Sequence, residues 1–230
     1  TWDGSDWVEG SGSSSITTEN VMFCIPTIYL SASSTSISMS SKSSEGTAFA
    51  HTIDGHTYEY LAIGVYEGYN NSSKLMSLSG KVSTASVTRP NFRTYAQANT
   101  VQNGKAMLWN FYQWNLWRIM TIFAMKSFNG QVRIGQGGFT YNGSTGQGLC
   151  NAMGPFAGST STSASTSTSV KAFIENPWGY KYEFIDDFVN SLGTAGTCYI
   201  GQNSTPDDTN SNKTSITLPT GSGFGSTIST

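Results

Sequence analysis

The chain has 230 residues, of which 11% are charged and 13% are aromatic, and its formal net charge is −2. A typical soluble domain carries about 25% charged residues, so serine, threonine, glycine and asparagine must supply most of the polarity here. The small negative charge argues against the basic surface that nucleic acids and anionic membranes attract. The aromatic content, six tryptophans among it, is sufficient for a hydrophobic core and argues against disorder.

The N-terminal third predicts a leader followed by short strands. Residues 1–20 are rich in glycine and serine and are expected to form a linker or leader before one domain at 21–230. The run "NVMFCIPTIYLSAS" is rich in β-branched and aromatic residues and predicts a strand that Pro26 interrupts. Asp54-Gly55 is a turn signal, and the alternating run "TYEYLAIGVYE" after it predicts a further strand.

The middle of the chain predicts one dominant helix. Its most apolar stretch is 107–125, but this stretch carries Asn110, Gln113, Arg118 and Thr121, whereas a membrane span carries few polar residues. At about 100° per residue these four side chains share one side of a helix, whereas a fifth polar residue, Asn115, lies off this stripe. We therefore expect a core helix that protein surrounds nearly completely, with one thin polar stripe, and no insertion into a membrane.

Around this helix the elements are expected to be short. A short helix is predicted in "NFRTYAQAN", the long helix over 105–128, and a glycine-containing stop in "NGQVRIGQGG". Residues 140–170 are a low-complexity loop, "VKAFIENPWGYKYEFIDDFV" predicts a strand hairpin, and "CYIGQ" and "TSITLP" predict short strands. Many short strands, one long helix and long polar loops indicate the α+β class.

The cysteines and histidines are few. Cys24 lies in an apolar run and is expected to be buried, while Cys150 and Cys198 pair only if the compartment is oxidising and the geometry permits it. His51 and His56 are the only histidines, and no Cys/His spacing indicates zinc. We expect no metal and no cofactor.

Several stretches, taken in order, resemble a known group of domains. They are "MFCIPTIYL", "YLAIGVYEG", "LMSLSGKVSTASVTRPNFRTYA", "WNFYQWNLWRIMTIFAMKSFNGQVRIGQGG", "FIENPWGYKYEFIDDF" and "SITLPTGSGFG". This set resembles the C-type-lectin-like domains of phage and prophage tail-tip and fibre proteins, which are related to formylglycine-generating enzymes. Some of these domains are the variable proteins of diversity-generating retroelements. The resemblance runs from about residue 20 to the end of the chain.

The resemblance implies a small twisted antiparallel sheet flanked by helices, in a non-catalytic attachment domain of a virion tail or fibre. Its partners would be a host-surface glycan or protein and other virion subunits, and the assembly would be a homotrimer. In such domains a further Gly/Trp/Arg-rich segment normally follows, so the resemblance implies either that this chain is truncated at its C-terminal end or that another chain completes the domain. Trp178 would fill the core while Gly179 permits a close backbone approach. The other expected core residues are Trp109, Trp114, Trp117 and Phe123.

Two acidic segments were weighed as chemical sites. Calcium-dependent lectins bind sugar through a Glu-Pro-Asn triplet and a Trp-Asn-Asp partner. Here the order is Glu175-Asn176-Pro177 and Trp-Asn-Asp does not occur, so a structural role is favoured. Asp186 and Asp187 would point to opposite faces of a strand and cannot form a glycosidase pair, so a turn or a solvated edge is expected.

Tyrosines among serine, glycine and asparagine are typical of adaptable binding surfaces. Tyr66, Tyr69 and Tyr141 lie in or near polar loops and are the candidate receptor contacts. The favoured function is therefore attachment to a host-surface molecule, with a location on a virion or another extracellular surface. The alternatives are a structural virion protein and a cell-surface adhesin or filament subunit, and a glycan-cleaving enzyme is the weakest.

Overall fold

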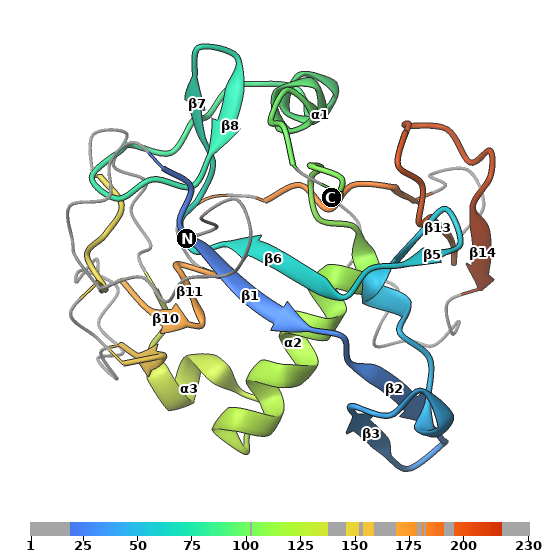
Figure 1. The fold of residues 1–230 in the computed structure, drawn as a ribbon. Helices are drawn as coiled ribbons and strands as arrows, with labels where there is room; N and C mark the ends of the chain where they lie inside the picture. Colours follow the sequence, from blue (N-terminus) through green and yellow to red (C-terminus); the bar gives the residue numbers. More distant parts are fainter. Residues whose placement is uncertain are drawn as a thin grey trace.

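The computed structural model describes residues 19–101, 103–137, 146–151, 154–158, 169–178, 181, 183–190 and 196–217. These residues form small antiparallel sheets and few helices, which agrees with the expected mixed α and β class. In Figure 1 the pair β1–β6 crosses the middle of the molecule with the helix α2 next to it.

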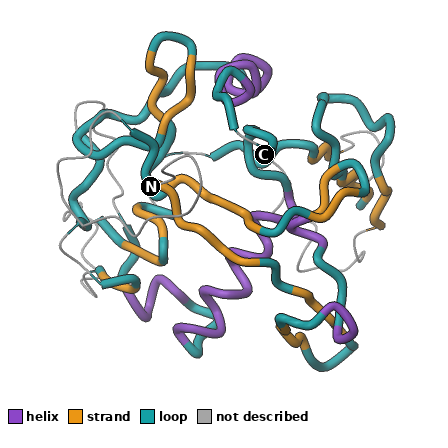
Figure 2. The backbone as a smooth tube through the Cα atoms, in the orientation of Figure 1, coloured by secondary structure: helices purple, strands orange, loops and turns teal. Residues whose placement is uncertain are grey.

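The helical elements, in chain order, are η1 (Ser43–Glu45), η2 (Phe49–His51), α1 (Arg89–Gln97), α2 (Phe111–Met125) and α3 (Gly130–Ile134). The strands up to residue 76 are β1 (Met22–Pro26), β2 (Tyr29–Ala32), β3 (Ile37–Ser40), β4 (Thr52–Ile53), β5 (His56–Thr57), β6 (Tyr60–Gly64), β7 (Tyr69–Asn71) and β8 (Lys74–Met76). The later strands are β9 (Phe156–Ala157), β10 (Lys171–Ala172), β11 (Ile174–Glu175), β12 (Phe188–Asn190), β13 (Thr197–Ile200) and β14 (Thr214–Thr217). Long loops connect these short elements (Figure 2).

The N-terminal strands follow the sequence signals. β1 ends at Pro26, which has no N–H for a sheet, and β2 begins three residues later. β1 pairs with β6 so that Met22 lies opposite Gly64 and Pro26 opposite Tyr60. The β4–β5 hairpin turns at Asp54-Gly55, where both residues have positive φ, 49° and 78°. Such a two-residue turn favours Asp-Gly because glycine adopts positive φ without steric strain.

The long helix is shorter than expected at both ends. Asn110 is extended (ψ 177°) and caps α2, its side chain accepting from the N–H of Gln113 while the Gln113 side chain accepts from the N–H of Asn110. At the other end Lys126 adopts the left-handed conformation (φ 52°) and terminates the helix. α3 then forms over a segment in which only a stop was expected.

The core lies between the β1–β6 pair, α2 and the β10–β11 segment. Its buried members are Ile25, Ala50, Ile63, Leu116, Trp117, Met125, Ile134, Val170, Ala172 and Ile174. The Trp117 indole N–H donates to the carbonyl oxygen of Ala172 at 2.8 Å, which ties α2 to β10. Trp178 is partly buried against the same cluster, and its indole N–H donates to the carbonyl oxygen of Gly135 at 3.0 Å.

The other predicted core residues differ in how far they are buried. Trp109 and Trp114 are half-buried against the core. Phe123 was expected inside and is 45% exposed, because it lies on the face of the last turns of α2 that no described element covers. Gly179 lies outside the described residues.

The polar stripe of α2 is also different from the expectation. Gln113 and Thr121 are buried and only Arg118 is exposed, so most of the stripe is buried inside the protein. None of the helices in the described ranges has the length and hydropathy that a membrane crossing needs.

Candidate binding surface

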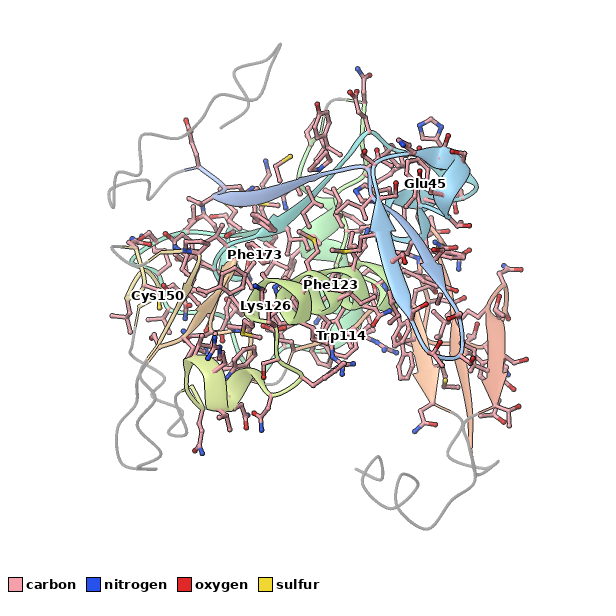
Figure 3. All side chains as sticks on the ribbon, turned by 90° about the horizontal axis from the view of Figure 1, so that it is seen from below. Glu45, Trp114, Phe123, Lys126, Cys150 and Phe173 are labelled. Carbon is pink, nitrogen blue, oxygen red and sulfur yellow. The ribbon has the colours of Figure 1, made fainter. Side chains whose placement is uncertain are left out.

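The two most exposed large apolar side chains of the described residues lie where α2 ends and α3 begins. Phe128 is 94% exposed, Val132 74% and Phe123 45%. Figure 1 shows the C-terminal end of α2 and the short helix α3 together at the lower edge of the molecule. We call Phe123, Lys126, Phe128, Val132 and Arg133 the α2–α3 edge. In the view from below, Phe123 and Lys126 lie on the part of α2 that faces the viewer (Figure 3).

Local backbone geometry explains why these side chains face outward. Asn129 caps α3 by accepting from the N–H of Val132 at 3.0 Å. Gly130 is the residue of α3 that meets Trp178, since a Cβ there would lie 2.8 Å from the indole ring. Because α3 contacts the core through Gly130 and the buried Ile134, Phe128 and Val132 point away from it.

The charge at this edge has one sign. The sequence from 111 to 137 contains no aspartate or glutamate, and its cations are Arg118, Lys126 and Arg133. Arg118 stacks over Trp114 at 5.1 Å from the ring centroid, whereas Lys126 and Arg133 form no ion pair with any described residue. A chain of net charge −2 thus has a locally cationic face beside exposed apolar groups. Such a patch is typical of an interaction surface.

The predicted tyrosine contacts have different positions. Tyr66 is 8% exposed, and its hydroxyl donates to Oδ1 of Asn151, so it is an interior anchor rather than a surface contact. Burial also raises the pKa of Tyr66. Tyr69 is half-buried on β7 with the Lys81 ammonium 5.8 Å from its ring centroid. Tyr141 lies outside the described residues.

The acidic triplet is structural. Glu175 is 2% exposed, and its two carboxylate oxygens accept from the backbone N–H groups of Gly148 at 2.7 Å and Cys150 at 2.8 Å. Asn176 is equally buried, accepts from the N–H of Val170 and donates to Oε1 of Gln147. These side chains hold the loop at 147–150 on the β10–β11 turn, which agrees with the structural interpretation.

Asp186 and Asp187 are not on a solvated edge, as was expected, because each is fully buried beside a cation from another part of the chain. Arg93 of α1 donates from Nε to Asp186 Oδ2 at 2.9 Å and from Nη2 to Oδ1 at 2.5 Å. Arg93 also contacts Asp208 at 2.8 Å. The guanidinium therefore joins α1 to two C-terminal segments, and these carboxylates raise the pKa of Arg93.

Asp187 has its own set of partners. Lys213 Nζ lies 2.9 Å from Oδ1, and Asn203 donates to Oδ2 from its backbone N–H at 2.9 Å and its side-chain amide at 2.8 Å. Lys213 also contacts Asp207 Oδ1 at 2.7 Å, and this hydrogen bond lowers the pKa of Asp207 to about 2. Neither aspartate is positioned as a free acid or base. Local alternation in the sequence gave no sign of either ion pair.

A further carboxylate, the half-buried Glu67, was not predicted from the sequence. Burial raises the pKa of Glu67, whose Oε2 accepts from the side-chain amide of Gln147 at 3.4 Å. Its neighbourhood includes Ser83, whose carbonyl oxygen accepts from Lys181 Nζ at 2.6 Å. Glu67 thus belongs to the same polar interior that Glu175 organises, and no spacing in the sequence distinguishes it.

The histidines and cysteines occupy separate places. His51 is buried with Nε2 3.3 Å from the carbonyl oxygen of Ile25, while His56 is exposed and packs edge-on against Tyr58. Across the described parts of the chain no three metal-ligating side chains gather. Cys24, Cys150 and Cys198 are all free thiols, and burial raises the pKa of Cys150 to about 12.

No family model matches the chain, and comparison with curated proteins and with solved structures found no match.

Proposed function

We propose that this chain is a non-catalytic attachment domain of C-type-lectin-like type, which binds a host-surface glycan or protein from a virion tail or fibre. The observation that carries the proposal is the α2–α3 edge, where three apolar side chains are exposed among cations. Aromatic side chains and arginine are enriched in protein interfaces, and this edge exposes Phe123 and Phe128 close in sequence to Arg133.

The carboxylates support binding rather than catalysis. Glu175, Asp186 and Asp187 are buried, and each accepts hydrogen bonds or ion pairs from fixed partners inside the protein. A general acid or base must reach the substrate proton directly or through one water. These three groups are used to hold loops in place.

The test compares one double variant with a matched control. The labelled chain is applied to a panel of bacterial cells and to an immobilised glycan panel. Phe128→Ser with Val132→Ser removes the two most exposed apolar side chains of the edge, and Ile37→Ser removes an apolar side chain on β3 that is 48% exposed. We expect at least a tenfold loss of binding for the double variant and none for the control, since a central apolar contact contributes about 2 kcal/mol or more. Equal binding by the wild type, the double variant and the Ile37→Ser control would refute the proposal that the α2–α3 edge contacts the host surface.

A structural role in the virion is the second candidate, because an exposed apolar edge also suits packing between subunits. It predicts a stable homotrimer in solution, no cell binding, and dissociation of the trimer by the double variant. Mass measurement in solution on the same proteins separates the two functions.

A further inference from the structure

The sheet β12–β13–β14 brings one lysine and one aspartate to the same end. Both outer strands are antiparallel to β13, so they run in the same direction. Asp187 immediately precedes β12 and Lys213 immediately precedes β14. In the register Phe188 lies opposite Ile200, and Ile200 opposite Thr214. Asp187 and Lys213 therefore start their strands side by side, with the end of β13 between them.

The residue between them is a glycine. Gly201 follows β13, and a Cβ at this position would lie 2.1 Å from Asp187 Oδ2. Neighbouring strands are about 4.8 Å apart, so the two outer strands are separated by about 10 Å. The missing side chain leaves room for Asp187 and Lys213 to meet over the middle strand.

The two reacting groups are in contact and shielded from water. Lys213 Nζ lies 2.9 Å from Asp187 Oδ1, and the two side chains are 1% and 0% exposed. A second carboxylate, Asp207, contacts the same Nζ at 2.7 Å. Two N–H donors of Asn203 point at the other oxygen of Asp187, at 2.9 and 2.8 Å. An amine, a carboxyl group and two donors for a developing oxyanion thus meet at one buried ion pair, and Asp207, whose side chain is 50% exposed, is the proton acceptor at its edge.

We propose that Lys213 and Asp187 join in an intramolecular isopeptide bond, which links the start of β14 to the start of β12 across β13. Asp207 accepts a proton from the Lys213 ammonium, and the neutral Nζ attacks Cγ of Asp187. The Nζ–Cγ bond forms, Cγ–Oδ1 breaks, and Oδ1 leaves as water after it has received the two protons released by the amine. No oxidant, reductant or other reactant is consumed.

Burial supplies the driving force. A fully buried ion pair keeps two desolvated charges, and its attraction often fails to offset their desolvation. Condensation replaces both charges with a neutral amide and releases water. Burial lowers the pKa of Lys213, but its hydrogen bonds with Asp207 and Asp187 outweigh this and leave the pKa raised. The ammonium form of Lys213 therefore dominates. Proton transfer to Asp207, which lies 2.7 Å from Nζ, sets the rate of bond formation.

The inference is independent of the attachment function, and mass spectrometry tests it on the full chain. Under denaturing conditions the intact protein is expected to be lighter than its sequence by one water. Trypsin normally cleaves after lysine, so an unlinked chain gives fragments 182–213 and 214–230. The linked chain gives a single fragment 182–230 lacking one water, because Lys213 is no longer recognised.

Three variants make the assignment specific. Lys213→Arg keeps the positive charge but is expected to restore the full sequence mass. Asp207→Asn is expected to leave at least a tenfold larger unlinked fraction at a fixed time after synthesis. Lys42→Arg changes a lysine in an exposed ion pair with Glu45 and should still lose the water. A wild-type chain of full mass, or a loss of water that persists in Lys213→Arg, overturns the proposal; circular dichroism of each variant before denaturation shows that it has folded.

Discussion

The variant Glu175→Gln tests whether the Glu175 carboxylate stabilises the fold or belongs to a sugar-binding site. Glu175 is 2% exposed and both oxygens accept from backbone N–H groups, those of Gly148 and Cys150. Glutamine has the same shape but only one acceptor oxygen. Its amide group must therefore face one of the two N–H donors, and that donor loses its partner.

The magnitude follows from the two hydrogen bonds. A hydrogen bond to a charged group contributes about 1.5–3 kcal/mol, and a buried donor without a partner costs about 1–3 kcal/mol. We expect the free energy of unfolding to fall by about 2–4 kcal/mol, out of a typical total of about 5–15 kcal/mol. For a domain of this size the melting temperature would fall by about 5–15 °C.

Urea unfolding followed by circular dichroism measures this change. The midpoint should fall while the m-value stays constant, because the variant alters stability and not the area exposed on unfolding. Glu59→Gln is the matched control, since Glu59 is exposed and its variant should stay within about 0.5 kcal/mol of the wild type. If both variants unfold alike, Glu175 is not the buried acceptor described above. If added Ca²⁺ stabilises the wild type alone, the lectin-type role rejected here would be correct.

Three further predictions concern other parts of the molecule. Trp117→Phe loses the indole donor to the Ala172 carbonyl and leaves a cavity, so urea unfolding should show a loss of about 2–3 kcal/mol; a loss below 0.5 kcal/mol would contradict the core assignment. Burial raises the pKa of Asp208, but Arg93 and Arg89 outweigh this and hold it below its ordinary value. Its stabilisation is therefore present above about pH 4, the pKa in the unfolded chain, and is lost as the pH falls further. Melting curves from pH 6 to pH 2 should show a drop of at most about 1 kcal/mol that Asp208→Asn removes, and a drop unchanged in that variant would exclude this carboxylate. The raised pKa and burial of Cys150 predict that a thiol reagent modifies it at least tenfold more slowly in the native protein than in denaturant, and equal rates would show that it is accessible.

Local elements could be predicted because their causes are local. Pro26 ends β1 through its missing N–H, and Asp54-Gly55 makes the β4–β5 turn through its positive φ values. The start of α2 was also readable, since Asn110 and Gln113 form the spacing of a capping box. The helix was nevertheless expected to begin at residue 105, because the apolar run continues upstream of Asn110. Hydrophobic periodicity does not reveal that Asn110 itself has an extended backbone.

Distant partners could not be predicted. The alternation around Asp186 and Asp187 describes one strand, whereas burial of these groups depends on cations 93 and 26 residues away. The candidate surface was missed for the opposite reason. Phe123 and Phe128 have apolar side chains that normally favour the interior, and only the packing of α3 through Gly130 shows that nothing described lies over them.

The anchoring of α1 has a consequence for biosynthesis. This helix spans only nine residues, and its arginines hold carboxylates 93 and 119 positions further along the chain. A nine-residue helix is marginal in water without tertiary support. On the ribosome, α1 therefore has to wait until the chain has been made as far as Asp208 before its arginines can reach their partners, so the docking of this helix is expected to lag behind its synthesis by more than 100 residues.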